Sequence, residues 1–302
     1  MRRPADPAFT TEGAFYKGNI HTHSTRSDGA RDPAAVCALY RDAGYDFLAL
    51  TDHFLARWDY PIVDTTPFRT AGFTTILGAE VHAPATLLGE AWHILAVGLP
   101  ADFVPPAADE TAPALAWRCH AAGAFLAIAH PAWYGLTTAD AAMLPMAHAV
   151  EIYNHTSQVR TDRGDSTGLV DQLLAEGRRL TVCAVDDAHL HCNDALGGFV
   201  MVKAPANTPE ALLDALRNGR FYSSQGPLIE TVTVTDDTVQ ITAAGPVSAI
   251  IALGRGSAAE QRVETGLTSA SLPLARFRTG GYVRVVLVDE KGRRAWTNPV
   301  WL

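Results

Sequence analysis

Two histidines stand two residues apart in the segment GNIHTHSTRSDG, residues 18–29. On an extended segment His21 and His23 project from the same face, so both imidazoles can reach one cation. Asp28 follows on a loop, and His53 ends the next apolar run, LALTDH. Imidazole nitrogens combined with carboxylate oxygens suit zinc, manganese or iron better than calcium. The segment therefore indicates a site for one of these metals.

More potential ligands recur along the chain, beside the strand-like runs TTILGAEVH, WHILAVGL, AFLAIAH and LTVCAVDDAH. They are Glu80, His93, His130, Asp187 and His189. A single histidine is more often an ordinary polar residue than a ligand, but one potential ligand after another at strand ends is not expected by chance. Active sites of barrels and open parallel sheets lie outside the carboxyl ends of the strands. The pattern therefore predicts one shared site.

The elements that must position these residues alternate along the chain. From about residue 16 to 218, short apolar runs alternate with helical patterns, which is typical of βα units around a parallel sheet or barrel. One helix is expected between Asp32, as its N-cap, and Gly44, with Pro33 in the first position. Others are expected near 111–122, 166–176 and 209–218. We predict an α/β unit over residues 1–224.

The pattern changes beyond residue 225 to alternating short strands without helices. Hairpin turns are expected at Asp236 and Asp237 and again at Lys291 and Gly292. We predict a small β-sandwich over residues 225–302. This segment contains no histidine, so the chemistry is assigned to the first unit. The second unit is left for packing, oligomerisation or shaping one wall of the site.

The composition bounds the possible partners and location. The 302 residues hold 24 Lys and Arg against 32 Asp and Glu, a formal charge of -8, which argues against binding a nucleic-acid polymer. No apolar run of about 18 residues is present that would cross a membrane, and no apolar segment follows Arg2 and Arg3. We expect a cytoplasmic protein with no membrane partner. The four cysteines show no CxxC spacing, and Cys37, Cys119 and Cys183 lie in core-like contexts, which favours reduced thiols.

The ordered motifs HTHSTRSDG, TDH, GAEVH, AHP, EIYNH and DDAH resemble those of the polymerase and histidinol phosphatase (PHP) superfamily. The resemblance covers nearly all of residues 18–200. The tail, ALRNGRFYSSQGP to AWTNPVWL, resembles the CehA/McbA-type branch of metallohydrolases, on motifs that are structural. The resemblance implies a distorted (β/α)7 barrel that holds two or three divalent metal ions, Mn, Fe or Zn.

The resemblance also implies an assignment of ligands to three ions. The first ion would take His21, His23, Glu80 and Asp187. The second would share Glu80 and add His93 and His130. The third would take Asp28, His53 and His189. Many relatives have a histidine at the position of Asp28, so occupancy of the third site is left open.

The chemistry of these residues fits metal-dependent hydrolysis. The two oxygens of Glu80 can span ions about 3.5 to 4 Å apart, and a water between such ions loses a proton near neutral pH. We expect a metal-bridged hydroxide to attack a small phosphomonoester or phosphodiester, with Glu80, Asp187 and His189 as the catalytic set. No serine or cysteine nucleophile is required.

Candidate contacts to a phosphorylated substrate are Arg26, Asn154 and Arg160, because guanidinium groups match phosphate oxygens. Arg163 is a further candidate of the same kind. Several neighbouring polar residues keep two interpretations. His82 is a substrate or ligand-orienting residue or an ordinary strand-end histidine; Asp52 and Asp186 orient ligands or serve structure. Glu151 is expected on the strand face opposite Asn154, as an ion-pair partner.

Two alternatives remain. The first is hydrolysis of a carbamate, ester or amide, which the tail's resemblance motivates. The second is a PHP-like module that binds or assembles without catalysis. Retention of every coordinating residue favours an enzyme acting on a small molecule. Homo-oligomerisation is possible, and the substrate is not identified by the sequence.

Overall fold

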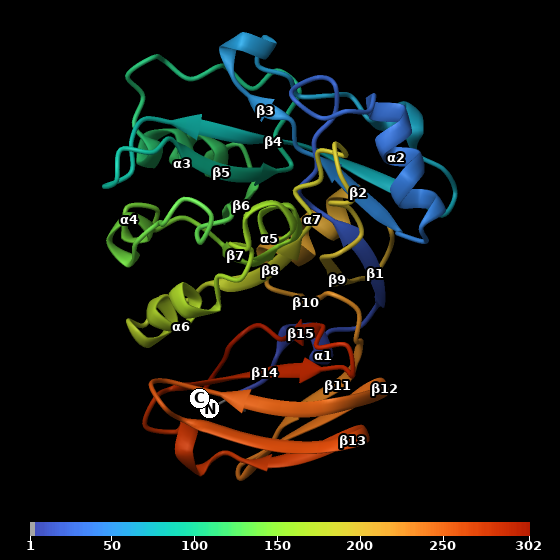
Figure 1. The fold of residues 1–302 in the computed structure, drawn as a ribbon, viewed down its shortest axis with the longest axis vertical. Helices are drawn as coiled ribbons and strands as arrows, with labels where there is room; N and C mark the ends of the chain where they lie inside the picture. Colours follow the sequence, from blue (N-terminus) through green and yellow to red (C-terminus); the bar gives the residue numbers. More distant parts are fainter. Residues whose placement is uncertain (1–3) are drawn as a thin grey trace.

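A computed structural model describes residues 4–302 and has a mixed α/β architecture rich in strands (Figure 1). Apart from α1, which lies beside the lower strands, the first two-thirds of the chain form the upper part in Figure 1, and the orange and red strands of the last third form the lower part. Arg2 and Arg3 lie outside the described residues. No helix within residues 4–302 is long and apolar enough to cross a membrane.

The strands of the upper part are mostly short and buried. They are β1 (Ala14–Asn19), β2 (Phe47–Leu50), β3 (His53–Phe54), β4 (Thr74–Ala83), β5 (Trp92–Val97), β6 (Phe125–Ile128), β7 (Ala149–Asn154), β8 (Thr181–Val185), β9 (Phe199–Ala204) and β10 (Phe221–Ser224). The lower part contains β11 (Ile229–Val234), β12 (Thr238–Leu253), β13 (Ala259–Pro273), β14 (Tyr282–Val288), β15 (Arg294–Trp296) and β16 (Val300–Trp301).

The four predicted helices are confirmed. The helices are α1 (Pro7–Thr10), α2 (Pro33–Asp42), α3 (Ala112–Ala121), α4 (Thr138–Ala142), α5 (His155–Thr161), α6 (Thr167–Ala175) and α7 (Pro209–Arg217), with 3₁₀ turns η1 (Ala56–Trp58), η2 (Thr66–Phe68) and η3 (Ala275–Phe277). The Asp32 side chain accepts the Ala35 N–H at the start of α2, where Pro33 is the first residue. Thr111 and Thr208 cap α3 and α7 in the same way. The short helices α1, α4 and α5 have no counterpart in the sequence prediction.

The strand order in the upper part is β9-β1-β2-β4-β5-β6-β7-β8. The expected parallel pairing holds for β1 with β2, β2 with β4, β6 with β7 and β7 with β8. It is wrong for β5, which is antiparallel to both β4 and β6, and for β9, which is antiparallel to β1. The connection from β4 to β5 spans only residues 84–91. A parallel crossover needs about a dozen residues or more, so this connection makes a hairpin.

On the free edge of β8, backbone N–H and carbonyl groups form hydrogen bonds with side chains and not with a neighbouring strand. Ser223 on β10 donates to the Val182 carbonyl at 2.8 Å and accepts the Ala184 N–H at 3.0 Å. The Asn298 side-chain oxygen, beyond β15, accepts the Val182 N–H at 2.8 Å. These bonds matter because a buried backbone group without a partner costs free energy. Residues from the end of the chain therefore complete the strand that leads to Asp187.

The lower strands continue from the upper sheet, because β15 pairs with β10. β12 pairs with β11, β13 and β14, and its inward side chains join one apolar core. Hairpin connections lie at Asp236–Asp237 and at Lys291–Gly292, as predicted. The three cysteines expected in the core, Cys37, Cys119 and Cys183, are buried and free.

Candidate metal centre

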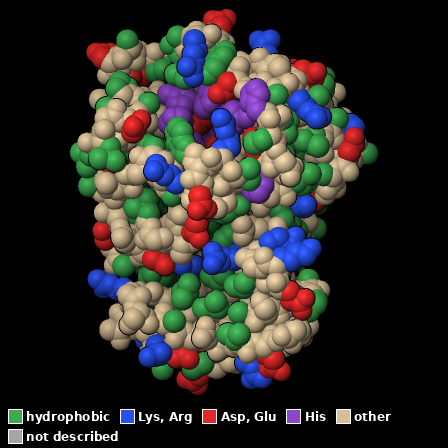
Figure 2. Space-filling view, in the orientation of Figure 1, with side chains coloured by type: hydrophobic (Ala, Val, Ile, Leu, Met, Phe, Trp, Pro, Cys, Tyr) green, Lys and Arg blue, Asp and Glu red, His purple; other side chains and the backbone are tan. Residues whose placement is uncertain are grey.

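The predicted ligands converge beneath one hollow in the upper part, where Figure 2 shows histidines gathered around a recess. A cavity of about 720 Å³ opens over them. The structure brings together all nine residues predicted to bind metal: His21, His23, Asp28, His53, Glu80, His93, His130, Asp187 and His189. They come from chain positions that lie far apart, mostly strand ends and the loops that follow them, whereas Glu80 lies within β4 and His93 at the start of β5.

Glu80, fully buried on β4, lies at the middle of the centre. Its Oε1 lies 2.7 Å from His93 Nδ1 and 3.0 Å from His130 Nε2. Its Oε2 faces a different set: it lies 2.6 Å from His53 Nδ1 and 3.6 Å from Nε2 of both His21 and His23. The two oxygens of one carboxylate thus serve two groups of histidines.

His21 is held by a second buried carboxylate. Its Nδ1 lies 2.6 Å from Glu151 Oε1, so this nitrogen carries the hydrogen. The opposite nitrogen, Nε2, has no hydrogen-bond partner within the described residues. It nevertheless lies 3.2 Å from Asp187 Oδ1. In the neutral ring this arrangement leaves a lone pair facing carboxylate oxygens, which is unfavourable unless a proton or a metal cation lies between them.

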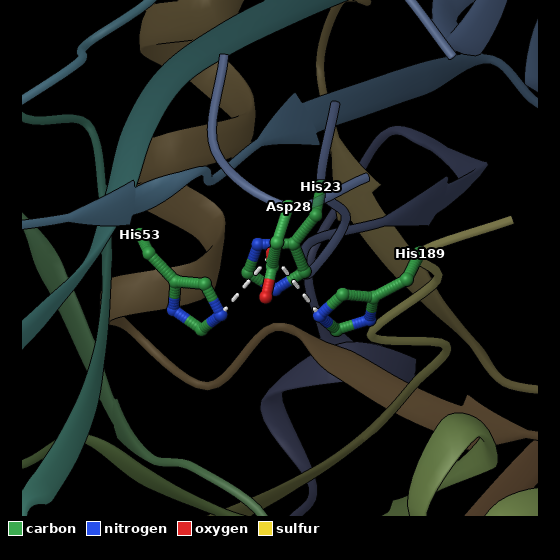
Figure 3. Close-up of side chains that lie close together, drawn as sticks. All are labelled: His23, Asp28, His53 and His189. Carbon is green, nitrogen blue, oxygen red and sulfur yellow. Dashed lines mark ion pairs between the residues drawn. The ribbon is translucent and has the colours of Figure 1, made fainter. Parts of the chain in front are cut away.

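A second group gathers His23, His53 and His189 around Asp28 (Figure 3). The Oδ1 atom of Asp28 lies 3.4 Å from Nε2 of both His53 and His189. His189 Nδ1 lies 2.8 Å from the Asp187 carbonyl oxygen, which can only accept. The neutral His189 ring therefore turns a lone pair toward Asp28, and the acceptors again converge.

Asp187 links these groups. Its Oδ1 lies 2.8 Å from His23 Nε2, and its Oδ2 accepts a hydrogen bond from Asn154 Nδ2 at 3.1 Å. Asp187 has φ of 57° and His130 has φ of 26°, in the left-handed region that side chains other than glycine rarely adopt. Such strain is characteristic of functional sites and is maintained here by the surrounding structure.

Electrostatics in the centre are dominated by burial and by charge pairing. Burial alone would raise the pKa of Glu80, but the histidines around it, His53 first, lower that pKa well below its usual value. Burial alone would lower the pKa of His53, but the Glu80 and Asp28 carboxylates together raise it to about 10. Burial and the neighbouring His189 and His53 lower the pKa of His23 to about 4. The carboxylates thus stay ionised and favour positive charge nearby.

Several buried polar atoms of the centre lack hydrogen-bond partners within the described residues, and they indicate whether divalent ions fit the site. Among them are His21 Nε2, His23 Nδ1, Glu80 Oε2 and His130 Nδ1. Unpaired buried polar atoms are costly, and four in one place need a common explanation. Imidazole and carboxylate together suit zinc, manganese or iron. The donor set therefore fits divalent ions.

The predicted substrate contacts separate in the structure. Arg160 on α5 lines the cavity above the ligands, whereas the exposed Arg26 lines a different hollow beside α2. Asn154 lies below the cavity and bonds to Asp187 and Glu151. Arg57 on η1 and Trp133 also line the cavity, and neither was identified from the sequence.

Glu151 lies on the same side of β7 as Asn154, not on the opposite face as expected. Asn154 Nδ2 donates to Glu151 Oε2 at 2.9 Å, and the backbone N–H of His130 donates to the same oxygen at 2.7 Å. The reason is a shift of register in β7 between Glu151 and Tyr153. Strict alternation would put Glu151 and Asn154 on opposite faces of β7, and one extra residue in the strand puts them on the same face. A bulge of this kind leaves no clear signal in a single sequence.

The other neighbours also take definite places. Asp52 accepts bonds from the backbone and hydroxyl of Ser24 and from the Ser27 hydroxyl, and so shapes the loop that carries Asp28. Asp186 orients no ligand histidine: it accepts the Tyr40 hydroxyl and three backbone N–H groups of residues 196–198. His82 lies beside His53 and His93 within the cluster.

The fold matches that of a solved structure over nearly its whole length. A two-domain protein from Bacteroides vulgatus that contains a predicted PHP-like metal-dependent phosphoesterase superposes with a TM-score of 0.55 at 16% identity, covering 99% of each chain. Two partial matches each have a TM-score of 0.42. A putative metal-dependent phosphoesterase from Bifidobacterium adolescentis is 16% identical and covers 57% of this chain and 87% of its own. An amidohydrolase from Chromobacterium violaceum with bound sulfate and no metal is 14% identical and covers 59% and 89%.

No family model matches the sequence, and the search of curated proteins gives no significant match. At 16% identity the likeness to the Bacteroides protein shows a common fold.

Proposed function

We propose that the chain is a metal-dependent phosphoesterase that hydrolyses a small phosphomonoester or phosphodiester. The observation that carries this proposal is Glu80, whose two oxygens face separate histidine groups on the floor of one open cavity. Divalent ions bound there would supply Lewis acidity and lower the pKa of water near the substrate. The PHP-like fold of the Bacteroides protein, itself a predicted phosphoesterase, supports the same class.

The ligand groups are part of the proposal. Glu80 would be shared between a group with His21, His23 and Asp187 and a group with His93 and His130. Asp28, His53 and His189 would form a third group, and His23 lies close to it as well. Three groups are compatible with two or three ions of Mn, Fe or Zn. The catalytic set would be Glu80, Asp187 and His189.

The chain's own residues would bind and orient the substrate. Arg57 and Arg160 bring two guanidinium groups to the cavity rim, where they can hold phosphate oxygens. Thr156 and Ser157 add hydroxyls to the lining, and Trp133 offers an apolar face beside His93 and His130. Arg160 remains a proposed substrate contact. Asn154 would act from below by holding Asp187.

We also propose a finer architecture: a distorted (β/α)7 barrel over residues 1–224 and a β-sandwich over residues 225–302. The chain would be related to the CehA/McbA-type branch. The lower strands would then be an accessory domain. The continuous pairing through β10 and β15 supports a firm connection between the two.

A direct test measures metal content and hydrolysis together. We expect the purified chain to contain Mn, Fe or Zn and, with manganese supplied, to turn over p-nitrophenyl phosphate. Glu80→Gln should lose metal and activity, and the exposed remote Glu176→Gln should retain both. Turnover of an aryl carbamate alone would replace the phosphoesterase by the carbamate, ester or amide hydrolase. Absence of bound metal together with no turnover after reconstitution would favour a binding module.

A second test concerns the arginines. Arg160→Ala should raise KM for the phosphoester about 10- to 100-fold, since a charge-assisted hydrogen bond contributes about 1.5 to 3 kcal/mol. Arg26→Ala should leave KM unchanged because Arg26 lines another hollow. A rise in KM for Arg26→Ala alone would show that Arg26, and not Arg160, reaches the substrate.

A further inference from the structure

His82 on β4 is buried among the metal-site residues, but the ligand groups proposed above do not use it. It lies directly opposite His93 in the antiparallel ladder of β4 and β5. Its Nδ1 lies 3.2 Å from the carbonyl oxygen of Trp92, and its Nε2 lies 2.9 Å from His53 Nδ1. His82 thus connects the backbone of β5 to a ring that faces Asp28.

The hydrogens in this chain of contacts follow from its ends. The Trp92 carbonyl oxygen can only accept, so Nδ1 of His82 carries a hydrogen. In the neutral ring Nε2 of His82 is then an acceptor, and the hydrogen between the two histidines belongs to His53 Nδ1. In the neutral His53 ring, the form that can bind a metal ion, this leaves the lone pair on Nε2. That atom lies 3.4 Å from Asp28 Oδ1.

Glu80 is a second acceptor close to the same hydrogen of His53. Glu80 Oε2 is closer to His53 Nδ1, at 2.6 Å, but it has no partner in hydrogen-bond geometry among the described residues. The contact with His82 does have that geometry. The direction of the contact therefore favours His82 as the partner of His53 Nδ1, because a hydrogen bond weakens steeply as its angle closes.

We propose that His82 is a positioning residue that fixes the tautomer of His53, so that His53 presents Nε2 as a ligand beside Asp28. The inference rests on the proposed metal centre. His189 shows the same principle with a simpler partner, since the Asp187 carbonyl oxygen fixes its Nδ1 hydrogen. Partners of this kind set the tautomer and orientation of metal-binding histidines.

Two substitutions separate positioning from direct ligation or packing. Leucine removes both polar atoms of His82, whereas glutamine places a carbonyl oxygen near the former Nε2 and can still accept from His53. We expect His82→Leu to weaken zinc binding at one site by about 10- to 100-fold and to lose about one equivalent of zinc on dialysis. His82→Gln should retain that equivalent. The exposed His120→Gln serves as the control.

The comparison of the two variants overturns the proposal if they behave alike. Equal loss of zinc in both would make His82 a ligand or a packing residue. Equal retention would make it unnecessary. Zinc content measured by mass spectrometry and thermal unfolding of each variant keep a folding defect apart from a defect in binding.

A measurement on the metal-free chain tests the hydrogen bond itself. In protein labelled with nitrogen-15 at histidine, scalar coupling across an N–H···N bond should connect His53 Nδ1 with His82 Nε2. A directly bonded hydrogen on His82 Nε2, or the absence of the coupling, would overturn the assignment. This readout does not require activity, so failure of the proposed phosphoesterase reaction would leave it intact.

Discussion

Nδ1 of His21 lies 2.6 Å from Oε1 of Glu151, and both side chains are completely buried. Glu151 also accepts from the His130 backbone and from Asn154, so one carboxylate organises residues of three strand ends.

Glu151→Gln should therefore weaken metal binding without unfolding the chain. The amide loses the negative charge that favours His21 as a ligand, and its NH₂ group meets the donors of His130 and Asn154. Partners behind a metal ligand typically contribute 10- to 100-fold in affinity, and we expect a loss of about that size. Competition with a chromogenic chelator measures it, with Glu176→Gln as the control. Unchanged zinc affinity would contradict this role.

Metal removal should lower thermal stability. The centre gathers the ionised Glu80 and Asp187 with several partnerless atoms, and ions that bind only the folded chain stabilise it by mass action. With ions at about 100 times their Kd, chelation should lower Tm by about 5 to 10 °C. Differential scanning fluorimetry with and without chelator checks this. The chelator effect should shrink in Glu80→Gln; an equal effect in that variant would place the stabilising ion elsewhere.

Asp171→Asn should destabilise the contact between the two parts of the chain. Arg284 on β14 is fully buried and its Nη2 lies 2.7 Å from Asp171 Oδ1 on α6. Neutralising the partner leaves a buried guanidinium uncompensated, at a cost of about 3 kcal/mol. Asp165→Asn is the matched control, because the Arg294–Asp165 pair is about half exposed and should cost less than about 1 kcal/mol. Urea unfolding measures both, and equal losses would refute the difference.

Asp6→Asn should remove part of the pH dependence of stability. Burial raises the pKa of Asp6 to about 7, partly offset by its bond from the Ala8 N–H. The folded chain therefore binds this proton more tightly than the unfolded chain, whose value is 3.8. The contribution of this proton to the free energy of unfolding is fully present below about pH 4 and is lost as the pH rises through about 7.

The Asn variant should gain on the wild type as the pH rises. Between pH 4 and pH 8, the difference in unfolding free energy between the variant and the wild type should shift by about 1 to 4 kcal/mol in favour of the variant. Urea unfolding at both values measures the change, with the exposed Asp109→Asn as the control. An identical difference at pH 4 and pH 8 would show that Asp6 does not titrate in this range.

The convergence of the candidate ligands could be predicted from the sequence because each of them belongs to a local motif. His21 and His23 share a face by simple alternation, and Glu80 and Asp187 stand at the ends of strongly apolar runs. Burial of those runs fixes their direction, so the strand ends and their polar residues meet. The helix that begins after Asp32 was predicted for a similar reason, since its N-cap and Pro33 are local signals.

The missed features depend on pairing between distant segments. His82 enters the cluster because the β4–β5 hairpin sets it opposite His93, and that pairing follows from the short 84–91 connection. The shortness of this connection would have predicted the hairpin from the sequence. The side of β7 on which Glu151 lies depends on a bulge. Arg26 lies away from the cavity because hydrogen bonds to Asp52 set the course of its loop. Neither property is encoded in local periodicity.

The bonds that Asn298 makes with β8 have a consequence for biosynthesis. Val182 and Asn298 are separated by 116 positions, so a ribosome must synthesise the intervening chain before the Val182 N–H finds its partner. Until then the nascent protein carries an open backbone edge beside the strand that precedes Asp187. Completion of this edge therefore waits until residue 298 has been synthesised.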